Sequence, residues 1–72
     1  MRMTFDSHVD AAYLAVEHHI RAGAAVENVV VERAGRGDIV LDFDAEGRLL
    51  GVEIIGASAL LSPAVLAAAD PI

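Results

Sequence analysis

The chain has 72 residues, no cysteine and a formal net charge of −6, and 56% of its residues are apolar. This length predicts a single domain over residues 1–72. The missing cysteines exclude disulfides and cysteine-based zinc sites, and the negative charge argues against nucleic acid as a partner. A chain this small cannot bury so much apolar surface alone, which predicts a homodimer or other homo-oligomer, or a small protein partner.

We expect a cytoplasmic protein with no membrane span. The apolar stretch from Ala57 to Ala69 is too short to cross a bilayer, and Ser58, Ser62 and Pro63 interrupt it. The cytoplasmic prediction rests on the missing cysteines and on the lack of an apolar, signal-like N-terminal segment.

The N-terminal third begins with a short alternating stretch at residues 2–5, which predicts a strand, and a turn follows at residues 6–10. Residues 11–22 fit two patterns. As a helix they would begin at the N-cap Asp10 and end at Gly23. As a strand they would place Ala12, Leu14 and Val16 on one face and Tyr13 on the other. Local signals alone slightly favour the helix.

Three strands are predicted in the middle of the chain, at residues 26–33, 38–43 and 49–55. A turn at residues 34–37 separates the first two, and a four-residue hairpin loop at residues 44–47 separates the last two. The pairs predicted for the hairpin are Phe43 with Arg48, Leu41 with Leu50, and Ile39 with Val52.

The C-terminal segment carries a helix signal at Ser62 and Pro63, a cap followed by proline at the first helical position. The predicted helix covers residues 63–69 and has no charged residue before Asp70, so it has no polar side that would face solvent. The apolar residues of this segment that we take as interface candidates are Leu60, Leu61, Val65 and Leu66.

Two segments resemble the signatures of a bacterial family, domain of unknown function number 2283. They are residues 4–16 (TFDSHVDAAYLAV) and residues 39–58 (IVLDFDAEGRLLGVEIIGAS). The resemblance implies an α+β fold, a small antiparallel β-sheet of four to five strands with a short C-terminal helix. It also makes residues 11–16 a strand. The positions of unknown role that fall in the signatures are Asp6, Asp10, Tyr13, Asp42, Asp44, Gly47, Gly51 and Glu53.

The sequence departs from the family pattern at Phe5, where tyrosine is usual, and in the long, alanine-rich residues 17–28, which leave room for a helical turn. The resemblance brings no activity. Some family members are encoded beside small toxin-like proteins, which implies a possible antidote role.

The chemically active residue types do not form a recognisable site. His18 and His19 are adjacent, so their side chains diverge and are not expected to share one metal ion with His8. The carboxylates of the predicted hairpin are expected to form a solvated acidic face. Glu53 is the exception, because it lies mid-strand between apolar residues and calls for an arginine partner, either Arg48, Arg33 or one from another chain.

No catalytic, cofactor-binding or metal residues are therefore predicted. We expect a non-enzymatic protein-interaction module that self-associates. One alternative is an antidote subunit whose segment from Leu60 to Leu66 occludes a toxin encoded nearby. The other is a metal-binding or hydrolytic protein that uses the acidic hairpin.

Overall fold

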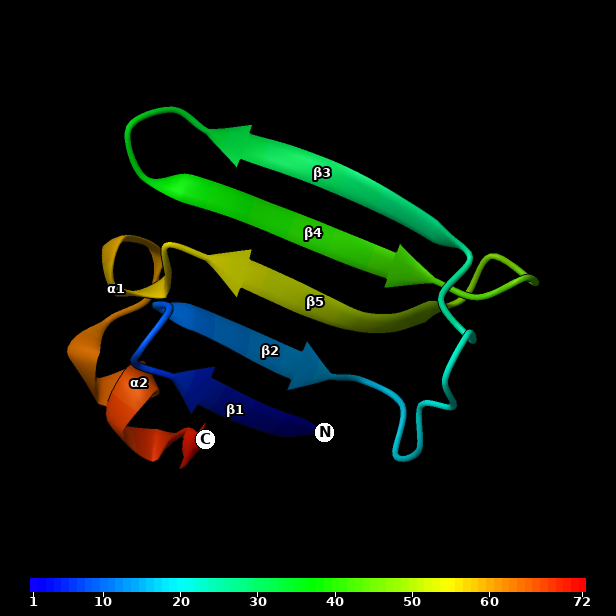
Figure 1. The fold of residues 1–72 in the computed structure, drawn as a ribbon, viewed down its shortest axis with the longest axis horizontal. Coiled ribbons are helices and arrows are strands. Elements are labelled where there is room, and N and C mark those ends of the chain that lie inside the picture. Colours follow the sequence, from blue (N-terminus) through cyan, green and yellow to red (C-terminus); the bar gives the residue numbers. More distant parts are fainter.

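The computed structural model describes residues 1–72 and consists of one mixed β-sheet with two short helices packed at one end (Figure 1). The strands are β1 (Arg2–Asp6), β2 (Ala11–Ala15), β3 (Glu27–Arg33), β4 (Gly37–Phe43), β5 (Leu49–Ile55) and β6 (Asp70–Pro71), and the helices are α1 (Ala57–Leu60) and α2 (Pro63–Ala68). In space the strands follow the order β3-β4-β5-β2-β1-β6. The predicted α+β class is confirmed.

The sheet has six strands and not the predicted four to five, because the chain returns to it after α2. The additional strand, β6, pairs in parallel with β1, with Thr4 opposite Asp70 and Phe5 opposite Pro71. All other strand pairs are antiparallel. A two-residue strand that ends in proline has no alternating pattern, so sequence periodicity could not reveal it.

The structure resolves the ambiguity of residues 11–22 in favour of a strand at their start. β2 pairs with β1 on one side and with β5 on the other, and these two ladders outweigh the local helix pattern. Residues 17–28 contain no helical turn. The Ala24 amide instead donates to the Arg21 carbonyl at 3.0 Å and closes a turn in this connection.

β4 and β5 form the predicted hairpin, but their register differs from the predicted one by two residues. Leu41 lies opposite Val52, whereas we predicted Leu50, and the other interior pairs are displaced in the same way. The displacement has two parts: Phe43 lies opposite Leu49 and not the predicted Arg48, and an irregularity between Asp42 and Phe43 adds one extra residue in β5. Because the displacement of the interior pairs is even, their side chains keep their predicted faces.

The strand register places ten apolar side chains on one face of β1 to β5, in two rows across the sheet. From β1 through β2, β5 and β4 to β3, the first row is Met3, Leu14, Val52, Leu41 and Val29, and the second is Phe5, Ala12, Ile54, Ile39 and Val31. We call these ten residues the apolar face. No polar side chain interrupts either row, which is typical of a sheet surface that packs against another layer.

The two helices lie at one end of the sheet (Figure 1). Ala57 of α1 is fully buried and forms the core with Ala12 and Ile54 of the apolar face. The half-buried residues that pack around this core are Phe5, Val52, Leu60, Leu61 and Leu66. Only six residues of the chain are buried, so the helices cover the apolar face in part.

The helix α2 begins at the predicted residues. The side chain of Ser62 accepts a hydrogen bond from the Val65 amide at 3.3 Å, and Pro63 occupies the first turn. The helix ends at Ala68, one residue before the predicted end. Neither α1 nor α2 has the length and apolar character that a membrane crossing requires.

Candidate functional site

The apolar face is the most prominent surface that the fold leaves incompletely covered. The helices pack near Phe5, Ala12 and Ile54, at the end of the face close to α1. At the far end Val29 and Val31 are 40% and 42% exposed. The apolar face is therefore buried at the end near α1 and exposed to solvent at the end formed by β3.

The four interface candidates of the C-terminal segment have different surroundings. Leu60, Leu61 and Leu66 pack against the core of their own chain. Val65 is 40% exposed, on the side of α2 that also lines a hollow with Met3. Of the four, Val65 is the one that extends the open apolar surface.

The opposite face of the sheet, which we call the polar face, carries a cluster of Tyr13, Asp42 and Glu53 around Gly51. Tyr13 lies directly opposite Glu53 on the neighbouring strand, and Asp42 lies directly opposite Gly51. A Cβ atom at Gly51 would collide with the hydroxyl and ring of Tyr13. The tyrosine side chain therefore lies across the glycine and occupies the space that a larger residue would need.

The electrostatics of this cluster favour a proton on Glu53. A hydrogen bond with the Asp42 side chain is the main cause that raises the pKa of Glu53, and partial burial and the Asp42 charge add to it. Asp42 is buried and accepts a further hydrogen bond from the Asn28 side chain. Burial also raises the pKa of Tyr13, helped by both carboxylates.

The predicted arginine partner of Glu53 is not found within the chain. Arg48 instead contacts Asp44 at 3.2 Å and Glu46 at 3.5 Å in the hairpin loop. Arg33 makes no salt bridge with any residue of the chain. In place of the expected arginine, the neighbour that acts on the Glu53 carboxyl is the Asp42 side chain, which raises the pKa of Glu53.

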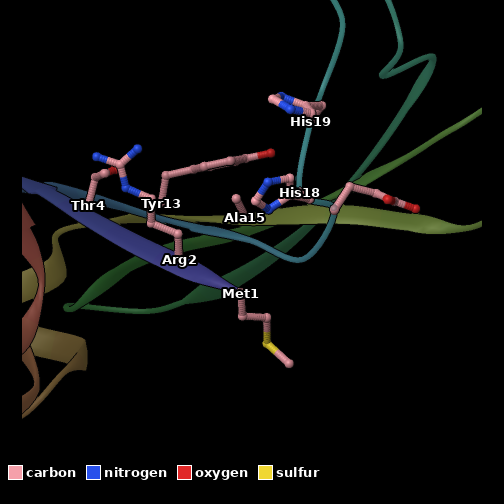
Figure 2. A pocket seen from close by; sticks show the side chains of 8 residues that line it. Met1, Arg2, Thr4, Tyr13, Ala15, His18 and His19 are labelled. Atoms are coloured by element: carbon pink, nitrogen blue, oxygen red, sulfur yellow. The ribbon is translucent and has the colours of Figure 1, made fainter.

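A shallow hollow of about 670 Å³ adjoins the cluster on the polar face, between β1, β2 and the connection that follows β2. Figure 2 shows Tyr13 lying along this hollow with its hydroxyl directed toward the segment that carries His18 and His19. The two imidazole rings meet edge to face, with centroids 4.8 Å apart. Both histidines are exposed.

The imidazole and carboxylate groups do not converge on a common point. No group of three such side chains lies close enough to hold a metal ion. His8, which is distant in sequence from the other two histidines, lies 3.5 Å from Asp6 in the first turn.

Two signature aspartates fasten turns. The Asp6 side chain accepts the His8 amide at 2.9 Å. Asp44 accepts the amides of Glu46 and Arg48 at 3.0 and 2.8 Å, and the Arg48 amide bond is the main cause that lowers the pKa of Asp44. Gly47 completes the same loop with φ of 78°, a value that favours glycine.

Asp10 links the first turn to α1, across 48 residues of sequence. Its carboxylate accepts the Ser58 amide at 3.0 Å and the Ser58 hydroxyl at 2.7 Å. Its backbone carbonyl accepts the amides of Gly56 and Ala57. Asp10 thus serves as an N-terminal cap for a helix that has no capping side chain of its own.

Residues 2–58 match the model of the family described as "Protein of unknown function (DUF2283)". The chain belongs to this family. The DUF2283 match contains the whole apolar face and the polar-face cluster, and it ends within α1, so α2 and β6 lie beyond it. Comparisons with curated proteins and with solved structures found no significant match.

Sequence reasoning identified the signature residues of this DUF2283 chain but not their contacts. The link between Asp10 and Ser58 joins residues with no common local pattern. The close approach of Tyr13 to Gly51 had one usable signal, a glycine inside a strand, which often marks a site where another group comes close.

Proposed function

We propose that this DUF2283 chain is a non-enzymatic interaction module of the cytoplasm that associates with a second copy of itself through the apolar face. The observation that carries the proposal is the pair of uninterrupted apolar rows, of which the helices cover only one end. Domains are built from at least two packed layers, and the helices provide a second layer over only one end of this sheet. A second sheet laid on the first would complete it as a sandwich.

The accessible surface of the chain is larger than expected for a monomer of its mass, which supports association with a second copy. The accessible surface is 4934 Å² for a mass of 7.5 kDa, whereas folded monomers of that mass expose about 4,250 Å². The excess of roughly 700 Å² is close to the area of about 800 Å² that each partner contributes to a standard interface. One interface with a second copy accounts for the excess.

The surroundings of the nucleophilic and acidic side chains support a binding role over catalysis. The chain has no cysteine, Ser58 is bonded to Asp10, and Ser62 caps α2. Asp42 raises the pKa of Glu53 and Tyr13 lies directly opposite Glu53, so these polar groups face one another across neighbouring strands.

Sedimentation equilibrium at micromolar concentration tests the proposal, with thermal unfolding over a hundredfold range of protein concentration. We expect a dimer or a larger assembly whose melting temperature rises with concentration, because association stabilises the folded state by mass action. A folded monomer with a constant melting temperature would contradict the proposal.

A pair of neighbouring substitutions locates the interface. Leu41→Lys places a charge in the apolar face, and Val40→Lys places the same charge one residue away on the polar face, opposite Glu53. We expect Leu41→Lys to raise the dissociation constant on the order of a hundredfold or more, because its charge would be buried in the interface. Val40→Lys should leave the dissociation constant within about threefold of that of the unmodified chain, because its charge stays exposed. Equal effects of the two variants would exclude the apolar face as the interface.

A further inference from the structure

The two outer edges of the sheet are built differently. One edge is β6, which has two residues, contains Pro71, and holds Asp70 in a salt bridge with Arg2 at 3.0 Å. Short length and proline are the usual devices that prevent a sheet edge from pairing with another strand. This edge is closed to further pairing.

The other edge is β3, and none of these devices protects it. All seven of its residues are exposed, including three consecutive valines, Val29 to Val31. It contains no proline, glycine or lysine, and its pairing with β4 runs without a bulge. An exposed seven-residue edge with an apolar centre is a template for another strand.

The charges at the two ends of β3 are opposite and unpaired. Glu27 begins the strand and Arg33 ends it. The salt bridges of the chain join Arg2 to Asp70, His8 to Asp6, and Arg48 to Asp44 and Glu46, so neither end of β3 takes part in one. An antiparallel copy of the same strand would bring each charge next to its opposite.

We propose that two copies of the chain pair β3 with β3 in antiparallel fashion, about a two-fold axis at Val30, to form one continuous sheet. The partner strand is a second copy because this arrangement pairs the charges at the two ends of the strand, Glu27 and Arg33, and places Glu32 opposite the amide side chain of Asn28. In this register Glu27 faces Arg33 of the second copy, Asn28 faces Glu32, Val29 faces Val31, and Val30 faces itself.

Other symmetric registers lose this complementarity. A two-fold axis perpendicular to the sheet requires a displacement by an even number of residues, so the nearest alternatives centre on Val29 or Val31. Either alternative places Glu27 or Arg33 opposite a valine and leaves two residues of each β3 without a partner in the other β3. The register centred on Val30 pairs all seven residues and forms two Glu27–Arg33 contacts by symmetry.

The edge pairing goes beyond the proposed function, because it uses a surface other than the apolar face. A two-fold axis perpendicular to the sheet leaves the apolar faces of both copies on the same side, where each remains free to pack against another layer. The two contacts are therefore compatible and can be tested separately.

Cross-linking of Val30→Cys tests the pairing directly, since the chain has no other cysteine. Directly opposed Cβ atoms of antiparallel strands lie about 4.5–5.5 Å apart, which dibromobimane can bridge between two thiols. We expect efficient cross-linking of Val30→Cys into covalent dimers. Ile55→Cys is the control, because Ile55 is 44% exposed on the same polar face but lies on an interior strand.

Charge exchange in the Val30→Cys background tests the register. We expect Glu27→Arg and Arg33→Glu each to lower the initial cross-linking rate by about tenfold, because two exposed pairs change from attraction to repulsion. The double variant restores the pairs in reversed order and should return the rate to within twofold. Loss in both single variants with recovery in the double variant supports the proposal, even if one single variant is less stable.

The outcome that overturns the edge pairing is a cross-linking rate for Val30→Cys no higher than for Ile55→Cys, or single charge variants without effect. An edge occupied by a strand of another protein would give this result too. A different result contradicts the proposed function, namely a chain that is monomeric in sedimentation equilibrium. If the chain associates and Leu41→Lys dissociates it while Val30→Cys stays unlinked, the edge inference fails and the proposed function stands.

Discussion

Tyr13 is accommodated on the polar face because residue 51 has no side chain. The tyrosine hydroxyl and ring lie where a Cβ atom of residue 51 would be, and the Leu14 carbonyl lies 3.0 Å from the same point. Burial and the charges of Asp42 and Glu53 raise the pKa of Tyr13, whereas the hydrogen bond with Asp42 is the main cause that raises the pKa of Glu53. The signature positions Tyr13 and Gly51 thus depend on one another.

Glu53 gives a prediction for stability against pH. Its pKa is raised in the folded chain above the ordinary value of 4.5, so the folded state retains the proton when the unfolded state has lost it. The stabilisation is complete below pH 4.5 and is lost as the pH rises through the folded pKa. Glu53→Gln keeps a neutral hydrogen-bond donor at every pH.

We therefore expect the melting temperature of Glu53→Gln to exceed that of the unmodified chain by a few degrees at pH 7, and to equal it at pH 4. Circular dichroism melts between pH 4 and pH 8 measure the difference. A difference independent of pH would show that Glu53 is ionised in the folded chain or is bound to a cation. Glu46→Gln, in the exposed hairpin loop, serves as the control.

At the scale of elements, α1 depends on a residue that is 48 positions away. Four residues are too few for a stable isolated helix, and the first turn has no acidic side chain of its own. Asp10 supplies the carboxylate, and its φ of 54° is a conformation that aspartate and asparagine adopt more readily than most residues. The turn between β1 and β2 therefore fixes the position of α1.

Substitution of Asp10 measures this dependence. We expect Asp10→Ala to lower the free energy of unfolding by about 1–2 kcal/mol, because the Ser58 amide and hydroxyl lose their partner and alanine tolerates the backbone conformation poorly. Asp10→Asn should lose less than half as much, since asparagine caps well and accepts positive φ. Urea unfolding monitored by circular dichroism gives both values. Equal losses would mean that the carboxylate charge, and not capping, holds α1.

At the scale of the whole molecule, the apolar face and the net charge act against each other. Each copy carries a formal charge of −6, so two copies repel at a distance, whereas the ten apolar residues attract on contact. The Debye length falls from about 10 Å at 0.1 M salt to about 3 Å at 1 M. Salt removes most of the repulsion and leaves the apolar contact intact.

We therefore expect the dissociation constant of the assembly to fall several-fold between 0.1 M and 1 M sodium chloride. Sedimentation equilibrium across this range measures it. Weaker association at high salt would show that the ion pairs at the β3 edge, and not the apolar face, supply most of the binding. The Glu27→Arg/Arg33→Glu double variant should show the same salt dependence as the unmodified chain.

The local patterns determined several features that the structure confirms. The alternation of residues 38–43 and 49–55 identified β4 and β5 and assigned the side chains of their interior pairs to the correct faces. Ser62 and Pro63 marked the start of α2. The hairpin strands and this helix start depend on chain geometry within a few residues, which local patterns reflect directly. The family resemblance, against the local helix signal, assigned residues 11–16 to a strand, and β2 covers Ala11–Ala15.

The features that the sequence left open depend on residues that are far apart. The place of β2 between β1 and β5, the shifted hairpin register, the pairing of β6 with β1 and the link from Asp10 to Ser58 each required the complete sheet. By itself the sequence determined which side chains are apolar and how they alternate along each strand. Only the tertiary structure decided that they join into one surface and that β3 lies at an open edge, because strand order follows from the packing of the whole chain and not from any local pattern.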